Sequence, residues 1–289
     1  MLIDEALVRR LISLEFPQWV ALPVRAIQPG GTDNRSFRLG DDLLVRLPSD
    51  EAYAAQVCKE QHWLPRLAAA LPLPIPEPIA MGQPAAGYPF SWSIYRWLNG
   101  ESASASSIAD HSEFARQLAQ FLLALQSCDA SAGPPSGPHN FHRGGSLAHY
   151  DHEVRRAMDL LGSVIDTPAV TAVWQSALAS PWAGQPTWVH GDISPGNLLV
   201  RNGQLAAVLD FGQLGVGDPA CDLTIAWTFL QGRSRRTFRD VVKLDDATWA
   251  RARAWALWKG LIVAAGLSPT HAIEWSRPLR VVDEVLADA

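Results

Sequence analysis

The sequence predicts an α+β protein whose short strands lie near the N-terminus and whose remaining length is mostly amphipathic helix. Short apolar runs between residues 24 and 47 alternate with segments rich in Gly and Asp. After residue 110, apolar side chains recur mainly at helical spacing. The pair Asn202-Gly203 separates two apolar runs, residues 198–200 and 205–209, which is a strong signal for a hairpin among these helices.

Length, charge and cysteine content exclude several classes of protein. A chain of 289 residues suits two lobes or one large domain. Its formal net charge of −5 gives no basic surface for nucleic acid, and no apolar run is long enough to span a membrane. The first residues are acidic where a signal peptide is basic. The three cysteines are widely spaced in apolar surroundings, so we expect buried free thiols and a cytoplasmic protein.

A glycine-rich segment joins the first two predicted strands, residues 24–28 and 37–39. Glycine lets the backbone approach a ligand closely, so such a segment can turn its N–H groups toward phosphates. The residues assigned to this contact are Gly30, Gly31, Thr32, Asn34 and Ser36. A segment of this kind is more often an ordinary turn, but its position two strands before a basic residue favours phosphate binding.

That basic residue is Arg46, in the third predicted strand at residues 43–47. It is either a phosphate-binding side chain or a half-exposed strand arginine without a partner. Ser49 or Asp50 is expected to cap the next helix, which runs from Glu51 to about residue 70. Glu60 lies inside this helix and is the acid best placed to pair with Arg46.

The remaining predicted elements follow in order. Alternation over residues 90–98 predicts a strand that ends at Asn99-Gly100. Asp110 and Glu113 form a capping pair before a strongly amphipathic helix. Residues 133–145 form a Pro- and Gly-rich loop whose two histidines lack further metal ligands nearby. Additional helices are predicted at residues 146–161, 168–178, 220–230, 246–265 and 270–286.

The residues that carry chemistry lie between positions 188 and 222. His190-Gly191-Asp192 is followed by Asn197 and, after the hairpin, by Asp210-Phe211-Gly212. The hairpin would carry Asn197 and Asp210 to the same end. Magnesium prefers a few carboxylate or carbonyl oxygens together with the phosphates of its substrate. Phosphoryl transfer requires such a metal site and one more Asp to orient the attacking hydroxyl, which Asp192 supplies.

This set of motifs resembles the aminoglycoside phosphotransferase family, whose signature is HGDxxxxN followed by D-[FIW]-[GE]. It also resembles the catalytic loop and DFG element of protein kinases, with Gly191 where those have Arg. The resemblance covers nearly the whole chain. It implies a bilobal protein-kinase-like fold, with a nucleotide-binding lobe at residues 1–98 that contains a small antiparallel sheet and helices. A larger, mostly helical lobe at residues 99–289 would hold the catalytic loop and the acceptor.

The resemblance also implies roles in catalysis. Asp192 would orient or deprotonate the acceptor hydroxyl, while Asn197 and Asp210 would bind Mg2+. His190 and Asp222 would support the catalytic loop rather than take part in proton transfer or metal binding.

Nucleotide binding is implied for the N-terminal lobe. Arg46 would hold the phosphates in place of the usual strand Lys, and Glu60 would position it. The segment from Gly30 to Ser36 would cover the phosphates. The main chain of Arg96 and Leu98 would bind the purine of ATP or GTP, whose identity side chains do not specify.

The predicted function is Mg2+-dependent transfer of the γ-phosphate of ATP or GTP to a hydroxyl of a small molecule, either an aminoglycoside-type antibiotic or a hydroxylated metabolite. Residues 223–289 contain ten Lys and Arg but seven Asp and Glu, which argues mildly against a polycationic acceptor. Any acidic lining must then come from residues 101–186, which contain eight Asp and Glu and four Arg. A protein kinase and a catalytically silent nucleotide-binding module remain alternatives. Gly191 and the lack of an APE-like segment argue against the first, and only Arg46 favours the second. The sequence does not indicate an oligomeric state.

Overall fold

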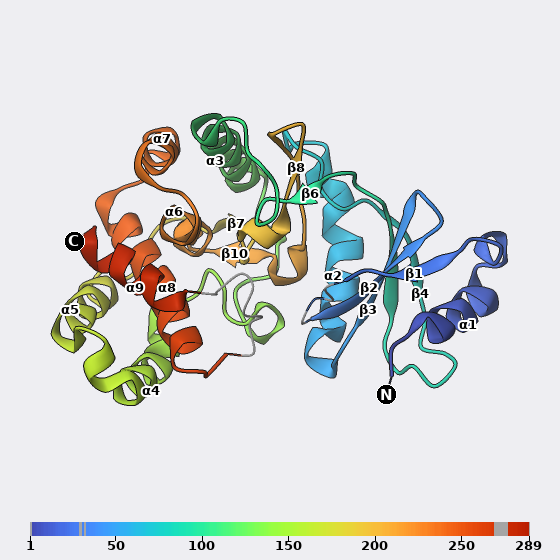
Figure 1. Cartoon of the computed structure of the whole chain (residues 1–289), viewed down its shortest axis with the longest axis horizontal. Helices are drawn as coiled ribbons and strands as arrows, with labels where there is room; N and C mark the ends of the chain where they lie inside the picture. The colour runs from blue at the N-terminus through green and yellow to red at the C-terminus, as the bar shows by residue number, and fades with distance from the viewer. Residues whose placement is uncertain (1, 29–30, 32, 269–276, 289) are drawn as a thin grey trace. The chain divides into compact units, whose positions relative to one another are not determined.

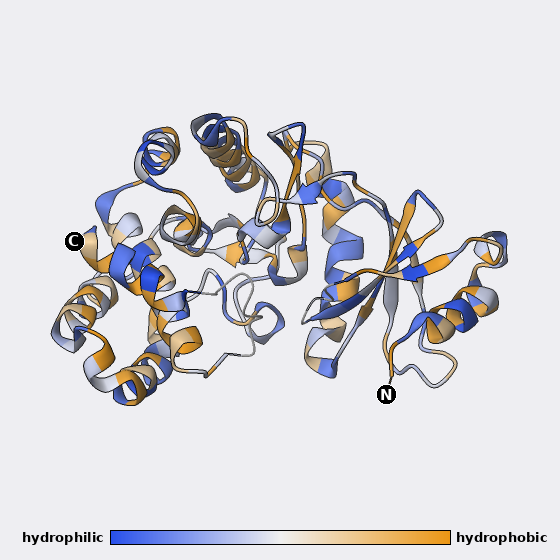
Figure 2. Ribbon diagram, viewed as in Figure 1, coloured by the Kyte–Doolittle hydropathy of each residue, from blue (hydrophilic) through white to orange (hydrophobic). Residues whose placement is uncertain are grey.

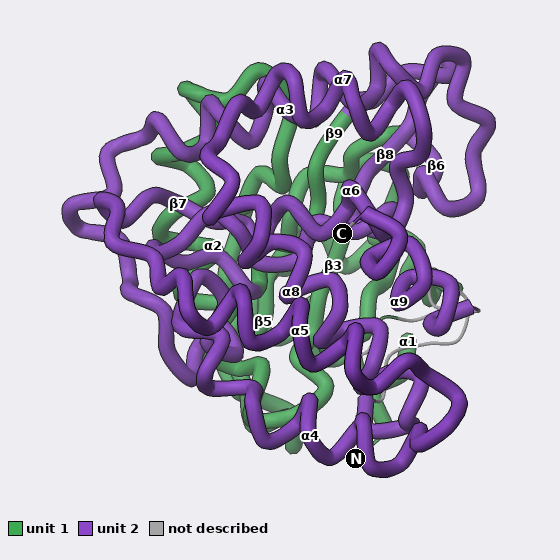
Figure 3. Tube along the Cα trace, turned by 90° about the vertical axis from the view of Figure 1, so that its left-hand side faces the viewer, with its two compact units in different colours: residues 1–99, 207–212 green, residues 100–206, 213–289 purple. Residues whose placement is uncertain are grey.

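The computed structural model describes residues 2–28, 31, 33–268 and 277–288 (Figure 1). The chain divides into two compact units, shown in Figure 3. Unit 1 comprises residues 1–99 and 207–212, and unit 2 comprises residues 100–206 and 213–289. The sequence predicted one boundary, between residues 98 and 99. It did not predict that residues 207–212 belong to unit 1. In that segment, the Val208 N–H donates to the Pro74 carbonyl at 3.1 Å.

Unit 1 is built on a five-stranded sheet with the order β1-β2-β3-β5-β4, in which the described pairings are antiparallel. Its strands are β1 (Val24–Ala26), β2 (Asn34–Leu39), β3 (Leu43–Pro48), β4 (Pro78–Gly82) and β5 (Trp92–Arg96). Figure 2 shows apolar segments along these strands. The small antiparallel sheet expected near the N-terminus is therefore present.

Strand β2 begins three residues earlier than predicted. Asn34 and Ser36 belong to this strand and not to a glycine-rich loop. The register explains the difference, because Asn34 lies opposite Pro48 and Ser36 lies opposite Arg46. Pairing with β3 thus outweighs the local turn preference of the segment. Gly30 and Thr32, which were assigned to phosphate binding, lie outside the described residues.

Two helices complete unit 1: α1 (Glu5–Glu15) and α2 (Glu51–Ala68). The buried side of α1 packs in one apolar core with strands β1, β2, β3 and β5. The Asp50 carboxylate accepts the Ala52 N–H at 3.1 Å, so Asp50 is the N-cap of α2 and Ser49 is not. This cap fixes the start of the helix that carries Glu60.

Unit 2 is mostly helical. Its helices are α3 (His111–Ser127), α4 (Asp151–Leu161), α5 (Thr167–Leu178), α6 (Ile225–Thr228), α7 (Gly232–Val242), α8 (Asp246–Ala264) and α9 (Pro278–Ala287). Strand β7 (Thr187–Val189) pairs with β10 (Gly215–Gly217). A second sheet has the order β6-β8-β9, with β6 (Glu101–Ser102), β8 (Leu198–Arg201) and β9 (Gln204–Val208), the last of which ends in unit 1.

Several helical predictions needed correction. The helix expected at residues 220–230 is a 3-10 helix (Pro219–Thr224) followed by the short α6. Helix α7 was not predicted. Phe238 and Val242 are its only buried large apolar residues, and two such residues are too few to show a helical periodicity. Helix α9 begins at Pro278, and the earlier part of the helix predicted from residue 270 lies outside the described residues.

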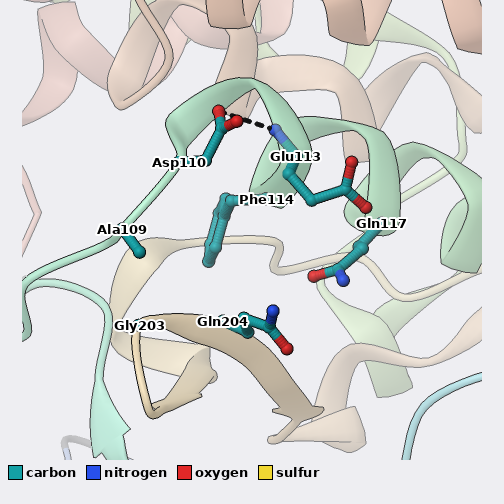
Figure 4. Close-up of a pocket in the computed structure, with 7 residues that line it drawn as sticks. All are labelled: Ala109, Asp110, Glu113, Phe114, Gln117, Gly203 and Gln204. Atoms are coloured by element: carbon teal, nitrogen blue, oxygen red, sulfur yellow. Dashed lines mark hydrogen bonds between the residues drawn. The ribbon is translucent and has the colours of Figure 1, made fainter.

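The predicted hairpin is confirmed. Asn202 and Gly203 both have positive φ, 54° and 76°, as a two-residue type I′ turn requires. Beside this turn lies a small cavity of about 50 Å³ (Figure 4). Its lining residues are Ala109, Asp110, Glu113, Phe114, Gln117, Gly203 and Gln204. Ligand pockets usually enclose about 300–1,000 Å³, so this cavity is too small for a nucleotide.

The structure also bears on two further expectations, the absence of a membrane-spanning segment and the burial of the cysteines. In the described part of the chain, no helix has both the length and the apolarity needed to cross a membrane. All three cysteines are free thiols. Cys221 is buried and Cys128 is half-buried, but Cys58 is exposed, so the expectation of buried thiols is wrong for Cys58. It lies on a face of α2 that turns away from the core.

Candidate active site

In unit 1, the guanidinium group of Arg46 lies between two carboxylates. Its Nη1 is 3.3 Å from Glu60 Oε1, and its Nη2 is 2.9 Å from Asp210 Oδ1. Burial lowers the pKa of Arg46, but Asp210 and Glu60 more than offset this, and the net pKa lies above its usual value. The alternative of a half-exposed arginine without a partner is therefore wrong. Arg46 is instead a buried side chain with two acidic partners.

Glu60 has a second partner that sequence reasoning missed. The Tyr95 hydroxyl donates to Glu60 Oε2 at 2.7 Å. Burial raises the pKa of Tyr95 well above its usual value, which keeps this hydroxyl protonated and able to donate. Alternation along β5 was the available signal, because it puts Tyr95 on the same face as Ser93, the cross-strand partner of Arg46.

The Asp210-Phe211-Gly212 segment has a special backbone conformation. Asp210 adopts a left-handed conformation with φ 61°, which Asp tolerates better than most residues do. Phe211 is fully buried. A Cβ atom on Gly212 would lie 2.5 Å from Gln56 Oε1, so a side chain there would require the Gln56 side chain of helix α2 to move. The backbone conformation therefore suits an Asp at position 210, and the Gln56 side chain packs closely against Gly212.

In unit 2, Asp192 and Asn197 form a hydrogen-bonded pair. Asn197 Nδ2 donates to the Asp192 main-chain oxygen at 2.9 Å and to Asp192 Oδ2 at 3.1 Å. Within the described residues, no hydrogen bond reaches Asp192 Oδ1 or Asn197 Oδ1. One carboxylate oxygen and one amide oxygen are thus left as acceptors for groups from outside the chain.

The backbone that carries Asp192 is held by two buried side chains. The Asp222 carboxylate, which is fully buried, accepts the N–H groups of His190 and Gly191, each at 2.7 Å. Burial raises the pKa of Asp222, although His190 and these N–H groups partly offset the effect. The ring of His190 is also buried, and its Nδ1 accepts the Asp192 N–H at 3.1 Å. Three successive amides of the loop are therefore fixed.

Gly191 cannot be replaced by a larger residue without rearrangement. Its φ is +85°, and a Cβ atom would lie 2.5 Å from the Gln213 carbonyl oxygen and 3.1 Å from Arg143 Cβ. Both the backbone conformation and the space therefore require glycine. This gives a physical reason for the Gly at the position where protein kinases have Arg.

The comparisons with known proteins decide the family. A family model described as the phosphotransferase enzyme family matches residues 24–255. That span includes strand β1, residues 188–222 and the first part of helix α8. The chain belongs to the phosphotransferase enzyme family. The family and the phosphotransferase class predicted from the motifs are thereby confirmed.

Curated relatives of this phosphotransferase family member match it over part of their length. The uncharacterized protein YcbJ of Bacillus subtilis (strain 168) is 25% identical over 183 residues, which are 60% of this chain and 55% of that protein. An aminoglycoside 3′-phosphotransferase of Escherichia coli is 37% identical over 51 residues, which are 18% of this chain and 19% of that protein. The chain thus matches about half the length of the first relative.

Solved structures match over nearly the whole chain. The GDP complex of wild-type aminoglycoside 2′-phosphotransferase-IIIa has a TM-score of 0.77 at 20% identity, covering 99% of this chain and 99% of that chain. The macrolide 2′-phosphotransferase MphH from Brachybacterium faecium has a TM-score of 0.62 at 20% identity, covering 97% and 98%. At these identities the matches show the fold, and the predicted kinase-like α+β fold is confirmed.

Three other residues assigned to nucleotide binding from the sequence, Gly31, Arg96 and Leu98, also lie in unit 1. The Arg96 side chain is exposed and pairs with Glu77 at 2.7 Å. The Trp97 N–H donates to the Asp42 carbonyl, whereas the Leu98 N–H makes no hydrogen bond within the described residues. Gly31 is close to β2, since a Cβ atom on it would lie 3.3 Å from the Asn34 carbonyl oxygen. Binding of a purine or phosphate at these positions stays a prediction.

Sequence reasoning also missed Arg143, which lies in the predicted loop at residues 133–145. Its Nε donates to Gln213 Oε1 at 2.9 Å, and its guanidinium carbon lies 4.6 Å from the Trp258 ring centre. It therefore links the loop to the residue that follows Gly212. In the same region the rings of His142 and His149 are stacked, with centres 3.6 Å apart. No group of three or more His, Cys, Asp or Glu side chains among the described residues could hold a metal.

Arg251 was missed as well. This buried residue of α8 pairs with Asp218, with Nε 2.6 Å from Oδ2. Asp218 is the N-cap of the 3-10 helix that carries Asp222, and it accepts the Ala220 N–H at 3.1 Å. The ion pair therefore holds the start of the 3-10 helix whose Asp222 side chain holds the loop at residues 190–192.

Replacing Asp222 by Ala is expected to destabilise the protein by about 3 kcal/mol, because the His190 and Gly191 amides would be buried without partners. Urea denaturation measures the effect. Asp110→Ala is the control, since this N-cap of α3 also accepts two N–H groups but is exposed, and caps usually contribute about 1 kcal/mol. Equal destabilisation in the two variants would contradict a bracing role for Asp222.

Proposed function

We propose that this member of the phosphotransferase enzyme family transfers the γ-phosphate of ATP or GTP to a hydroxyl group of a small molecule, with the help of Mg2+. The observation that carries the proposal is the Asp192–Asn197 pair. Asn197 Nδ2 holds one Asp192 oxygen and leaves the other available, while Asp222 and His190 fix the backbone behind it. A carboxylate held in this way suits one task, which is to receive and orient an acceptor hydroxyl.

Asp192 would act through its Oδ1 atom. The acceptor hydroxyl would donate its hydrogen bond to this oxygen, which aligns the hydroxyl oxygen for attack and takes its proton as the new P–O bond forms. The bond between the γ-phosphorus and the β–γ bridging oxygen breaks in the same step, and the nucleoside diphosphate leaves. Most of the rate in phosphoryl transfer comes from positioning and from charge neutralisation. A rigid loop is therefore as important as the basicity of the carboxylate.

Asn197 and Asp210 are the proposed protein ligands of the magnesium ion. Asn197 directs its amide nitrogen to Asp192, so its Oδ1 faces away as a potential ligand. Asp210 adds a carboxylate that is 35% exposed. Magnesium typically takes one or two carboxylates and completes its shell with phosphate oxygens and water, so two protein ligands suffice. The ion would supply neutralisation of negative charge on the phosphates.

Arg46 would bind the phosphates of the nucleotide. It is buried and charged, and its planar guanidinium group can form parallel hydrogen bonds to phosphate oxygens. Glu60 fixes one side of the group from helix α2. The Leu98 N–H would donate to the purine ring.

Names of similar structures support a nucleoside triphosphate donor. One is a GDP complex, and another is a streptomycin–ATP ternary complex of an aminoglycoside phosphotransferase, with a TM-score of 0.61 at 16% identity. For the acceptor, the excess of Lys and Arg in residues 223–289 disfavours polycationic aminoglycosides. Macrolides and neutral hydroxylated metabolites are therefore the first acceptors to test.

Acceptor-dependent nucleotide consumption tests the proposal. The acceptors are macrolides, aminoglycosides, choline, homoserine and sugars. Each acceptor is tested with ATP and with GTP, once in the presence of Mg2+ and once in EDTA. We expect at least one acceptor to stimulate consumption in Mg2+ and none to do so in EDTA. Tight nucleotide binding without stimulation by any acceptor would favour a catalytically silent module.

A further inference from the structure

The buried hydroxyl of Tyr95 completes a chain of three residues in unit 1. Tyr95, Glu60 and Arg46 are 1%, 3% and 9% exposed. Glu60 uses its two oxygens separately, since Oε1 accepts from Arg46 Nη1 at 3.3 Å and Oε2 accepts from the Tyr95 hydroxyl at 2.7 Å. Neither oxygen is left to water. The orientation of the carboxylate is therefore set from both sides.

The balance of charge explains why Glu60 needs this second partner. Arg46 is shared between two carboxylates, and its contact with Asp210 is the shorter one, 2.9 Å against 3.3 Å. A buried carboxylate is costly unless hydrogen bonds satisfy it. Tyr95 supplies a neutral donor, so it stabilises charged Glu60 without competing with Arg46 for the negative charge.

The three residues also connect three separate elements. Arg46 lies on β3 opposite Ser93 of β5, and Tyr95 lies two residues further along β5 on the same face. The Tyr95 ring centre is 5.9 Å from the Arg46 guanidinium carbon. Glu60 comes from helix α2. Through Tyr95, strand β5 of the sheet therefore holds Glu60, which in turn holds Arg46.

We propose that Tyr95 is a positioning residue that holds Glu60, and through it the Arg46 guanidinium group, in the orientation that binds nucleotide phosphates. The inference rests on the proposed function. A phosphate that binds Arg46 competes with Asp210 for the guanidinium N–H groups. Glu60 then remains the anchor of Arg46, and the Tyr95 hydroxyl keeps that anchor in place.

Tyr95→Phe keeps the ring and removes only the hydroxyl. We expect the Kd for the magnesium–nucleotide complex, measured by calorimetry, to rise about tenfold, because a hydrogen bond to a charged group contributes about 1.5–3 kcal/mol. Tyr88→Phe is the matched control. Tyr88 is also 1% exposed, and its hydroxyl donates to the Pro48 carbonyl at 2.8 Å rather than to Glu60. A rise in Kd for Tyr95→Phe no larger than that for Tyr88→Phe would overturn the proposal.

A double-mutant cycle separates positioning from general loss of structure. In the Glu60→Gln background, Tyr95→Phe should change the Kd by less than about twofold, because the charged partner is already gone. Fully independent effects of the two substitutions would also overturn the proposal. Calorimetry needs no acceptor, so the test stands even if no acceptor is found. A wild-type protein that binds no nucleotide would refute the proposed function together with this inference.

Discussion

Asp192→Asn is expected to lower acceptor-dependent turnover by about a thousandfold while changing nucleotide affinity by less than about twofold. The amide that replaces the carboxylate keeps its size and can still accept a hydrogen bond from Asn197. It cannot take the proton of the acceptor hydroxyl. The turnover number at saturating nucleotide and the Kd for nucleotide measure the two effects separately.

Asp159→Asn is a suitable control for this result. Asp159 is an exposed carboxylate on α4, so its neutralisation removes one negative charge from unit 2 without touching the catalytic loop. We expect it to retain full activity. Turnover by Asp192→Asn at more than a tenth of the wild-type rate would remove Asp192 from the role of base.

Asp210→Ala is expected to remove the magnesium dependence of nucleotide binding. In the wild-type protein, Mg2+ should tighten binding by on the order of a hundredfold, because a metal clamp on phosphates contributes several kcal/mol. Without the carboxylate, the Kd in Mg2+ should approach the Kd in EDTA. Calorimetric titration in both buffers measures the ratio.

Comparing the two buffers matters because Asp210 also pairs with Arg46. Loss of that ion pair affects binding in Mg2+ and in EDTA alike, whereas loss of a metal ligand affects only the former. Glu77→Ala removes another unit 1 carboxylate, one that pairs with Arg96 at the surface, and should preserve the ratio. An unchanged ratio in Asp210→Ala would exclude Asp210 from the metal site.

Local signals in the sequence predicted the parts of the fold that depend on local geometry. The hairpin followed from Asn202-Gly203, whose positive φ angles suit few other residue pairs. The start of α2 followed from a capping residue. Where long-range pairing decides, prediction failed: β2 extends back to Asn34 because β3 offers partners as far as Pro48. The position of residues 207–212 in unit 1 also depends on contacts between residues far apart in the sequence, so the sequence did not predict it.

For the site, the motifs identified residues close to one another in sequence. Asp192 and Asn197 are five residues apart, and one motif contains both of them. The missed residues make contacts over much longer separations. Arg143 meets Gln213 across 70 positions, and Tyr95 meets Glu60 across 35. Alternation along β5 places Tyr95 on the same face of the sheet as Arg46, but no pattern within one segment identifies Glu60 or Gln213 as the partner.

Transfer of labelled phosphate tests the central claim most directly. The protein is incubated with nucleotide labelled at the γ-phosphate, Mg2+ and the acceptors described above, and is then removed by ultrafiltration. We predict label on a small-molecule acceptor in the filtrate, and none on that acceptor when Asp192→Asn is used. Label found only on protein, or only as inorganic phosphate, would contradict phosphoryl transfer to a small-molecule hydroxyl.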